Sequence, residues 1–403
     1  MKDLAKVVSV KEVWKLPGKD KVQGCNFNEN GFEAMVSKDI KVGDLVVFIQ
    51  EGSILPILPQ WEFLRKRCYK EQFNGFLIKP QKFCDIKSWG LAVLLSQLPI
   101  TQNKFRVGDD LTDLLKIRKY EPIGDENPSK QSKSKLFNFL MRFKIFRKLR
   151  LFFIKNENGA FPTHLISKSD EELIQNNPDI LRKYCDKKVY ISAKMEGQSF
   201  TCLIEKKGNK LGKFYVCSRN KAYKKEVNNV FWNCAKKYNI EDKIRNFYKK
   251  TGKLLILQGE QVGPGIQENI YNLKSNEWFI YTIKDEISGK QLNIYELFLV
   301  CKEFGLKTVP LIETNIELNK YFSTIKDCEE YAEKVCWEKI DNSIQTHINL
   351  NNFDKKLIQH EGIVVRSIDY DKDNNIGFSF KIKNIDYVEK GLKKLHKMCI
   401  DYF

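Results

Sequence analysis

The sequence predicts an α+β protein of two domains, a small N-terminal β-barrel followed by a larger domain built on antiparallel sheet. The chain has 403 residues, more than one hydrophobic core usually serves. Its first 120 residues contain one short strand-like run after another, with glycines between them. From residue 161 onward, strand-like and helix-like segments alternate, and no glycine-rich phosphate loop indicates a doubly wound parallel sheet.

Residues 1–120 are expected to form an OB-like domain. Residues 8–11 alternate apolar and polar side chains, and residues 45–49 form a continuous apolar run of buried-strand length. Further strand candidates lie at residues 75–78 and 91–95. Short strands joined by glycine-bearing turns are typical of small barrels, and the OB-fold is the natural candidate.

Residues 121–160 interrupt this pattern and are interpreted as a basic linker. Glu121-Pro122 opens a stretch rich in Pro, Gly and Ser, and the segment from Lys130 to Lys155 has many basic residues and no acidic one. Apolar residues recur within it at helical spacing. Such a basic amphipathic helix contacts phosphates, lies on a membrane surface, or packs its apolar stripe on its own domain.

Residues 161–403 are expected to form the larger domain. Strands are predicted at residues 189–193, 199–204, 254–258, 278–283, 363–366 and 378–382, and one helix at residues 227–248. The strand-rich order indicates antiparallel sheet with helices packed against it.

Four short motifs lie in this domain, each beside a predicted strand. They are Lys194-Met195-Glu196-Gly197, then Gly259-Glu260 with Gly263-Pro264-Gly265-Ile266-Gln267, then Glu361 to Arg366, then Lys381-Ile382-Lys383. A lysine followed by x-acid-Gly is common by chance, but the four together in this order are a specific signal. They resemble the nucleotidyl-transfer motifs of the covalent nucleotidyltransferases, specifically ATP-dependent RNA ligases, over residues 160–390. The N-terminal region resembles more loosely the OB-type domain of one group of these ligases, around Pro17-Gly18, Val42-Gly43-Asp44 and Phe63-Leu64-Arg65.

The resemblance implies an ATP-grasp-like adenylation domain and a reaction in which a lysine accepts AMP from ATP. AMP then passes to an RNA 5′-phosphate, and a 3′-hydroxyl displaces it, with nick sealing as the favoured substrate. Carried over by position, Lys194 accepts AMP, Glu260 contacts the ribose, and Glu361 positions Mg²⁺ or Mn²⁺ through water. Lys381 and Lys383 are expected to contact the α-phosphate and the leaving group, and Arg219 the sugar or the phosphates. Trp278, or its neighbour Phe279, is expected to stack on adenine. Glu196 and Gly197 form the turn after the lysine, and Lys168 either reaches the nucleotide or is solvated.

The chemistry of Lys194 sets a requirement of its own. A free lysine has a pKa near 10.4, whereas a nucleophilic amine must be neutral. Positive neighbours or a metal ion must therefore favour the unprotonated form. Lys381 and Lys383, two apart on a predicted strand, share one face and are candidates for that charge.

Two departures from the family pattern bear on the class. Glu196 stands where many members have Asp, which affects the turn more than the chemistry. About twenty residues follow Lys383, too few for the OB domain that DNA ligases and mRNA guanylyltransferases carry there. This favours an RNA ligase over those two enzymes, as does the Gly263-Pro264-Gly265-Ile266-Gln267 run. A non-catalytic RNA-binding protein on a ligase scaffold is the other alternative, and the presence of every charged motif position argues against it.

Composition supports this interpretation without deciding it. A net charge of +18 favours polyanionic partners, here RNA or a nicked RNA-containing duplex, although lysine-rich composition bias explains the excess equally well. The 11 cysteines form no C-x-x-C pair, which argues against structural zinc and a disulfide framework. No signal peptide or transmembrane run is evident. We therefore expect an intracellular protein, cytoplasmic or nuclear and monomeric, with no membrane partner.

Overall fold

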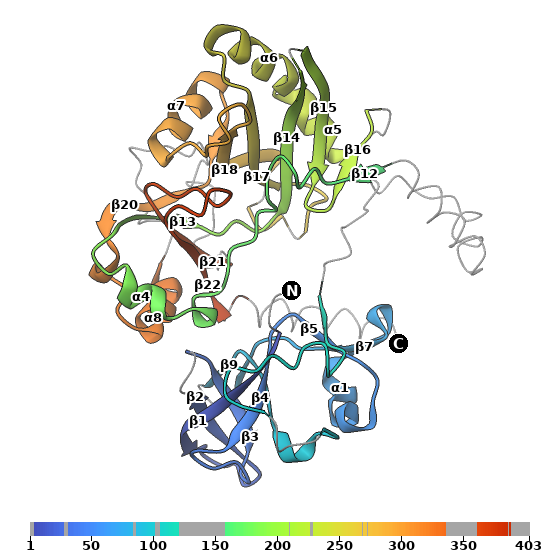
Figure 1. Ribbon diagram of the computed structural model, residues 1–403, viewed down its shortest axis with the longest axis vertical. Coiled ribbons are helices and arrows are strands. Elements are labelled where there is room, and N and C mark those ends of the chain that lie inside the picture. The colour runs from blue at the N-terminus through green and yellow to red at the C-terminus, as the bar shows by residue number, and fades with distance from the viewer. Residues whose placement is uncertain are drawn as a thin grey trace, which may run out of the picture.

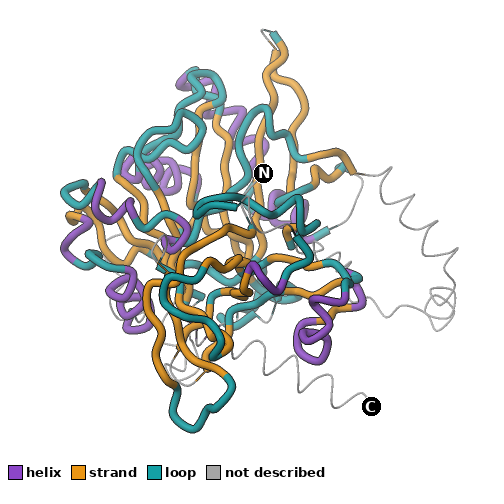
Figure 2. Tube along the Cα trace, turned by 60° about the horizontal axis from the view of Figure 1, so that its bottom comes forward, coloured by secondary structure: helices purple, strands orange, loops and turns teal. Residues whose placement is uncertain are grey.

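The structure is a computed structural model, and the parts of the chain that it describes are residues 4–27, 31–83, 86–100, 105–120, 158–208, 210–225, 229–267, 269–271, 273–335, 361–385 and 387. The expected basic linker lies outside these residues except for its last three positions. The proposed domain limits at residues 120 and 160 therefore stay predictions. Two bodies rich in strands are visible in Figure 1, and Figure 2 shows the helices at their periphery.

The N-terminal domain contains two sheets. Its strands are β1 (Ala5–Lys15), β2 (Val22–Phe27), β3 (Glu33–Ser37), β4 (Leu45–Gln50), β5 (Ser53–Leu55), β6 (Tyr69–Lys70), β7 (Gly75–Leu77), β8 (Gln81–Phe83), β9 (Ile86–Ser88), β10 (Gly90–Leu94) and β11 (Arg118–Lys119). The larger sheet has the order β10-β4-β1-β2-β3-β9-β8, and the smaller one β11-β5-β7-β6. Neither ladder joins its first strand to its last, so the described strands do not form the closed barrel that the sequence suggested.

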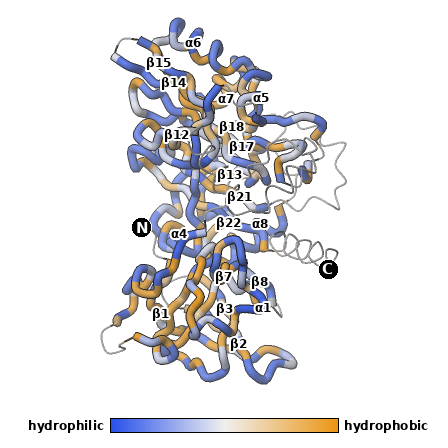
Figure 3. Tube along the Cα trace, turned by 90° about the vertical axis from the view of Figure 1, so that its right-hand side faces the viewer, coloured by the Kyte–Doolittle hydropathy of each residue, from blue (hydrophilic) through white to orange (hydrophobic). Residues whose placement is uncertain are grey.

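Strand alternation gives this domain two cores. On β4, Val47 and Ile49 pack into one cluster with Trp61 and Phe76. The intervening Val46 and Phe48 face the other side, where Phe27 and Trp89 lie. The apolar strands of this domain stand out from its polar loops in Figure 3. The continuous apolar run at residues 45–49 is therefore a strand buried on both faces.

The C-terminal domain also has two sheets. Its strands are β12 (Asn158–Ala160), β13 (Lys188–Ala193), β14 (Gln198–Lys207), β15 (Lys210–Ser218), β16 (Lys221–Tyr223), β17 (Leu255–Val262), β18 (Glu277–Asp285), β19 (Lys307–Thr308), β20 (Leu311–Glu317), β21 (Gly362–Ser367) and β22 (Ser379–Lys383). One sheet has the order β12-β16-β15-β14-β17-β18-β19, and the other β20-β13-β21-β22. All pairings but β18 with β19 are antiparallel.

Helices cover one face of each of these sheets. Helices α5 (Val230–Lys237), α6 (Ile240–Thr251) and α7 (Ile294–Phe304) pack against the seven-stranded sheet. Helix α8 (Ile325–Lys334) and the short η5 (Ile174–Asn176) pack against the four-stranded sheet. Residues on the other faces of the two sheets line the cavity that is described below. No helix in the described part of the chain is long and apolar enough to cross a membrane.

The single helix predicted at residues 227–248 is wrong, because the structure has two helices there. Asn239 lies between α5 and α6 with a φ of 50°, a left-handed conformation that no helix interior tolerates. Asn is one of the few residues that adopt it readily. The apolar periodicity continues across the break and therefore conceals it.

The N-terminal domain docks on the second sheet of the C-terminal domain. The indole N–H of Trp89 donates to Glu329 of α8 at 2.9 Å, and Lys87 lies 2.6 Å from Glu333. Ile385, just after β22, is buried in the core of the N-terminal domain. The two domains therefore share packed surface as well as charge pairs.

Candidate active site

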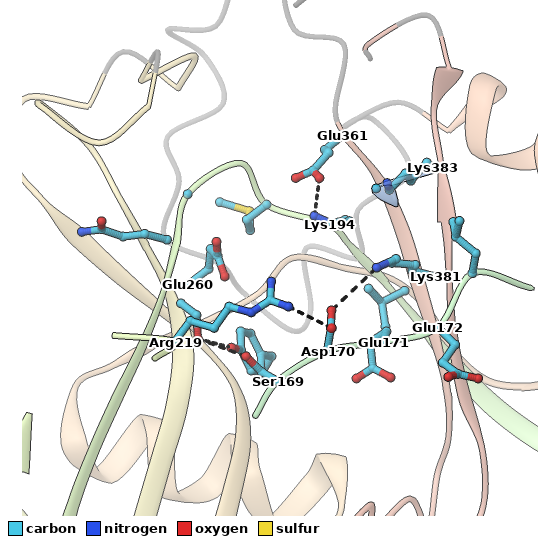
Figure 4. Close-up of a pocket in the computed structure, with 18 of the residues that line it drawn as sticks. Ser169, Asp170, Glu171, Glu172, Lys194, Arg219, Glu260, Glu361, Lys381 and Lys383 are labelled. Atoms are coloured by element: carbon cyan, nitrogen blue, oxygen red, sulfur yellow. Dashed lines mark hydrogen bonds and ion pairs between the residues drawn. The ribbon is translucent and has the colours of Figure 1, made fainter. Parts of the chain in front are cut away.

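A cavity of about 850 Å³ lies where the uncovered faces of both C-terminal sheets meet the N-terminal domain. Four of its lining residues are Lys194, Glu260, Glu361 and Lys381, from motifs far apart in sequence (Figure 4). Strand alternation explains why they meet. On β17, Leu255 and Leu257 face the helices, so Glu260 belongs to the opposite register and faces the cavity.

Lys194 directly follows β13 and is fixed by its backbone. Its amide donates to the carbonyl of Gly362 at 2.9 Å, which joins the lysine motif to the start of β21. Its Nζ lies 2.5 Å from Oε1 of Glu361, the residue that precedes β21. The expected nucleophile and the expected metal-binding carboxylate are thus direct partners.

Charges around Lys194 favour its ammonium form. Burial alone lowers the pKa of Lys194, but the nearby carboxylates of Glu361, Glu260 and Asp170 outweigh it and raise that pKa. From the sequence, we expect positive neighbours, Lys381 and Lys383, to favour the neutral amine of Lys194. In this structure the neighbouring acids dominate instead, so Lys194 must lose a proton before it attacks.

Glu260 is the second acidic residue at this point. Burial raises the pKa of its carboxyl to about 8, although Lys194 opposes the shift. Glu260 is therefore largely protonated at neutral pH and able to donate as well as accept a hydrogen bond. A hydroxyl-rich ligand such as a ribose suits such a group.

The turn after the lysine depends on Gly197. A Cβ at Gly197 would run into the carbonyl oxygen of Gln261 on β17, so only glycine fits. Gln267, from the Gly-Pro-Gly-Ile-Gln run, donates to the carbonyl of Gly197 at 2.5 Å and closes the turn from the other side. Glu196 does not line the cavity. Its amide donates to the Tyr271 hydroxyl at 2.7 Å, so it holds the turn.

Lys381 and Lys383 share one face of β22, as expected, and both line the cavity. The intervening Ile382 is buried in the core with α8. Burial, reinforced by the charge of Lys383, lowers the pKa of Lys381 to about 8, although Asp170 3.8 Å away opposes the shift. Lys383 is paired with Glu51 of the N-terminal domain.

Arg219 lines the cavity and pairs with Asp170 at 2.9 Å. Lys168 does not line it. The Lys168 ammonium instead donates a hydrogen bond at 2.7 Å to Asn220, which follows Arg219 and lines the cavity. Lys168 therefore contacts a cavity-lining residue without lining the cavity itself.

The aromatic expectation requires a correction. Trp278 is fully buried on the helix-covered face, with its ring 4.3 Å from that of Phe200, and does not reach the cavity. Phe279 faces the opposite way but is buried with Val262 and Tyr271. Tyr281 is the aromatic residue of β18 that lines the cavity, and its hydroxyl lies 3.3 Å from that of Ser199.

Sequence reasoning gave no role to several charged residues of the site. Asp170 and Glu171 lie just after Lys168, the one residue of this segment for which the sequence predicted a possible nucleotide contact. Glu171 pairs with Arg366 at 2.7 Å, and Arg366, only 4% exposed, also donates to the backbone oxygen of Tyr281 at 2.8 Å. A buried arginine inside an otherwise apolar strand was the available signal, because such a charge requires a partner.

Glu361 offers the carboxylate oxygen ligands that Mg²⁺ and Mn²⁺ accept. No group of three metal-ligating side chains exists among the residues that the structure describes. Mg²⁺ commonly binds through one or two carboxylates, several waters and substrate phosphates, and this donor set fits that mode.

Comparison with known proteins agrees with this geometry. Residues 187–383 match the family described as RNA ligase, and residues 4–95 match the PHA02142 OB-fold domain. Residues 187–383 therefore form an RNA-ligase-type domain, and an OB-fold domain lies ahead of it. No curated protein matches the chain significantly.

Solved structures show the same two-domain fold. A Naegleria gruberi RNA ligase variant with AMP and Mn superposes with a TM-score of 0.73 at 23% identity, covering 96% of this chain and 99% of that one. The Naegleria gruberi RNA ligase with PPi gives a TM-score of 0.72 at 23% identity, covering 97% of this chain and 99% of that one. The predicted α+β class with an N-terminal OB domain is therefore confirmed.

Proposed function

We propose that this protein is an ATP-dependent RNA ligase that joins a 3′-hydroxyl to a 5′-phosphate through a covalent lysyl-AMP on Lys194. The observation that carries the proposal is the meeting of Lys194, Glu260, Glu361, Lys381 and Lys383 in one cavity. Support for ATP and a divalent metal comes from the similar Naegleria gruberi structures, which contain ATP, AMP and Mn.

In the first step, Nζ of Lys194 attacks the α-phosphorus of ATP. The P–N bond forms as the P–O bond to pyrophosphate breaks, and the amine must first give up a proton. Glu361 would hold the divalent cation, whose positive charge would favour the neutral form of the Lys194 amine that now pairs with this carboxylate. Lys381 and Lys383 stabilise the charge that develops on the α-phosphate and the pyrophosphate.

The nucleotide base and sugar bind on the side of β17 and β18. Tyr281 offers an aromatic face at the cavity for adenine, and Glu260 offers hydrogen bonds to the ribose. Glu171 forms an ion pair with Arg366, and Arg366 donates a hydrogen bond to the backbone oxygen of Tyr281. These buried contacts orient the pocket before ATP arrives.

Two further steps complete the joining reaction. An oxygen of the RNA 5′-phosphate attacks the phosphorus of lysyl-AMP, the P–N bond breaks, and Lys194 leaves as an amine that takes up a proton. The 3′-hydroxyl oxygen then attacks the 5′-phosphorus of the adenylylated RNA. AMP leaves, and the hydroxyl proton is released.

A sealing assay tests the proposal. The purified protein is incubated with a nicked duplex whose 3′-hydroxyl strand is RNA, with Mg²⁺ or Mn²⁺ and with ATP, GTP or no nucleotide. We expect a sealed product and transient adenylylated RNA with ATP only. A covalent nucleotide from GTP and no sealing would indicate a guanylyltransferase, and RNA binding without any covalent nucleotide would indicate a binding protein.

A further inference from the structure

A lysine of the N-terminal domain reaches the cavity of the ligase domain. Lys119 is the last residue of β11 and lines the cavity. Its backbone is fixed by pairing with Ser53 of β5, and the next amide, that of Tyr120, donates to the carbonyl of Gly52 at 2.6 Å. The Lys119 ammonium lies 3.1 Å from Oδ2 of Asp170. A residue about 75 positions before the proposed nucleophile in sequence therefore belongs to the same pocket.

Asp170 is the meeting point of three cations from three separate elements. Arg219 lies 2.9 Å from its carboxylate, Lys119 3.1 Å and Lys381 3.8 Å. One carboxylate faces three positive charges and leaves an excess of two. A terminal phosphate monoester carries about −1.5 to −2 charges at neutral pH, which matches that excess.

Several further contacts between the two domains fix the position of Lys119. At the other end of the domain interface, Trp89 and Lys87 are tied to Glu329 of α8, and Ile385 is buried in the N-terminal core. Lys383, on the far side of Lys381, is paired with Glu51 of the N-terminal domain. The N-terminal domain therefore forms a fixed wall of the cavity.

We propose that Lys119, with Arg219 and Lys381, binds the 5′-terminal phosphate of the RNA strand and places it beside the nucleotide on Lys194. This inference rests on the proposed function. Asp170 holds the three cations together, and the phosphate takes over these contacts when RNA binds. Lys119 is thus a substrate-positioning residue supplied by the OB-fold domain.

The position of Lys119 favours RNA over the phosphates of ATP. Its side chain is 42% exposed, and the preceding residue, Arg118, is also exposed. A polynucleotide that extends outward from its terminal phosphate would meet this basic edge of the N-terminal domain. We expect ATP to be held by Glu260 and Tyr281 of β17 and β18, which belong to the C-terminal domain, whereas Lys119 comes from the N-terminal one.

A binding comparison tests the inference without relying on turnover. Two nicked duplexes are compared that differ only in a 5′-phosphate or a 5′-hydroxyl at the nick, in the absence of ATP. The wild-type protein should bind the 5′-phosphate form about tenfold or more tightly, since a charge-assisted phosphate contact is lost in the other. Lys119→Ala should remove most of that preference, and Lys119→Arg should retain it. Lys41→Ala, an exposed lysine of the same domain away from the cavity, is the matched control.

Separate assays of the reaction steps complete the test. We expect Lys119→Ala to become labelled by α-labelled ATP as the wild type does, and to transfer AMP to 5′-phosphate RNA about tenfold more slowly. An equal loss of labelling would assign Lys119 to the phosphates of ATP and overturn the inference. An equal loss of binding to both duplexes, or no loss at all, would also overturn it. If the wild type itself takes no label from ATP, the proposed function fails instead.

Discussion

At the scale of single residues, the account depends on the protonation of two lysines. Lys194 is held as an ammonium by Glu361, whereas burial and Lys383 lower the pKa of Lys381 to about 8. The first must lose its proton to act, and the second must keep its proton to stabilise phosphate charge. These opposite demands predict a rate that rises with pH and then levels off.

The break of that profile near pH 8 belongs to Lys381. Below about pH 8, kcat/KM for self-adenylation should rise with pH, because more of Lys194 becomes neutral while Lys381 stays charged. Above about 8, the loss of charge on Lys381 offsets that gain, so the rise should level off. Arginine stays charged throughout this range, so in Lys381→Arg the rise should continue to higher pH even if the rate is lower at each pH. The measurement is the initial rate of label incorporation from α-labelled ATP at subsaturating ATP, and an unchanged break in Lys381→Arg would assign the titration to another group.

The aromatic residues of β18 give a second prediction at this scale. Tyr281→Leu should raise the KM for ATP roughly tenfold with little change in Tm, because stacking on a base contributes about 1–3 kcal/mol. Trp278→Phe should instead lower Tm and leave this KM unchanged, because Trp278 packs on Phe200 in the core. Steady-state labelling and thermal unfolding of both variants are the measurements. The reverse pattern would return the adenine contact to Trp278.

Among the secondary-structure elements, the positions of strands were easier to predict from the sequence than the break between two helices or the closure of a barrel. Residues 45–49 were correctly placed because a continuous apolar run of that length suits a buried strand, and residues 189–193 because β-branched and aromatic residues favour strands. The break at Asn239 was missed because it depends on one backbone conformation within a continuous periodic pattern. The expected barrel closure failed for a similar reason, since strand pairing at the ends of a sheet is not encoded in local patterns.

The site shows the same division. The charged motif residues could be predicted to meet because each lies on a strand or directly beside one. The assignment of Trp278 failed because Trp278 shares the helix-covered face with Ile280, whereas Tyr281 lies on the other face, and the local pattern does not show which face is which. The contribution of Lys119 and Glu51 could not be foreseen, because it depends on how two domains dock.

The turn after the lysine motif gives a prediction at this scale. Gly197→Ala should push β14 away from the Gln261 carbonyl of β17, lower stability by about 1–3 kcal/mol and greatly reduce self-adenylation. Gly159→Ala is the matched control, because its Cβ would meet only Ala222 at 3.9 Å. Thermal unfolding and labelling of both variants provide the comparison. Equal behaviour of the two would show that the turn tolerates a side chain.

At the scale of the whole molecule, Glu329 connects the two domains. It accepts hydrogen bonds from Trp89 at 2.9 Å and from Gln175 at 2.9 Å, and lies 3.4 Å from Lys87. The side chains of Lys87 and Glu329 are only 16% and 12% exposed. Loss of Glu329 would leave the Trp89 and Gln175 donors without their acceptor, whereas Lys87 would keep Glu333 at 2.6 Å.

Glu329→Ala should accordingly destabilise the protein by about 1–3 kcal/mol, since the buried donors of Trp89 and Gln175 lose their acceptor. It should also reduce the preference for 5′-phosphate RNA, because Lys119 depends on correct docking. Glu303→Ala removes an exposed pair with Lys250 and should change stability by less than about 1 kcal/mol. Denaturant unfolding monitored by tryptophan fluorescence measures both. Similar losses for the two variants would contradict the docking role of Glu329.

The central claim, that Lys194 carries AMP, is tested most directly by locating the nucleotide on the protein. The protein is incubated with Mg²⁺ and α-labelled ATP, digested, and the labelled peptide is sequenced by mass spectrometry, in parallel with Lys194→Ala. We expect one adenylylated lysine, Lys194, in the wild type and no covalent label in the variant. A nucleotide on another residue, or label that persists in Lys194→Ala, would contradict it.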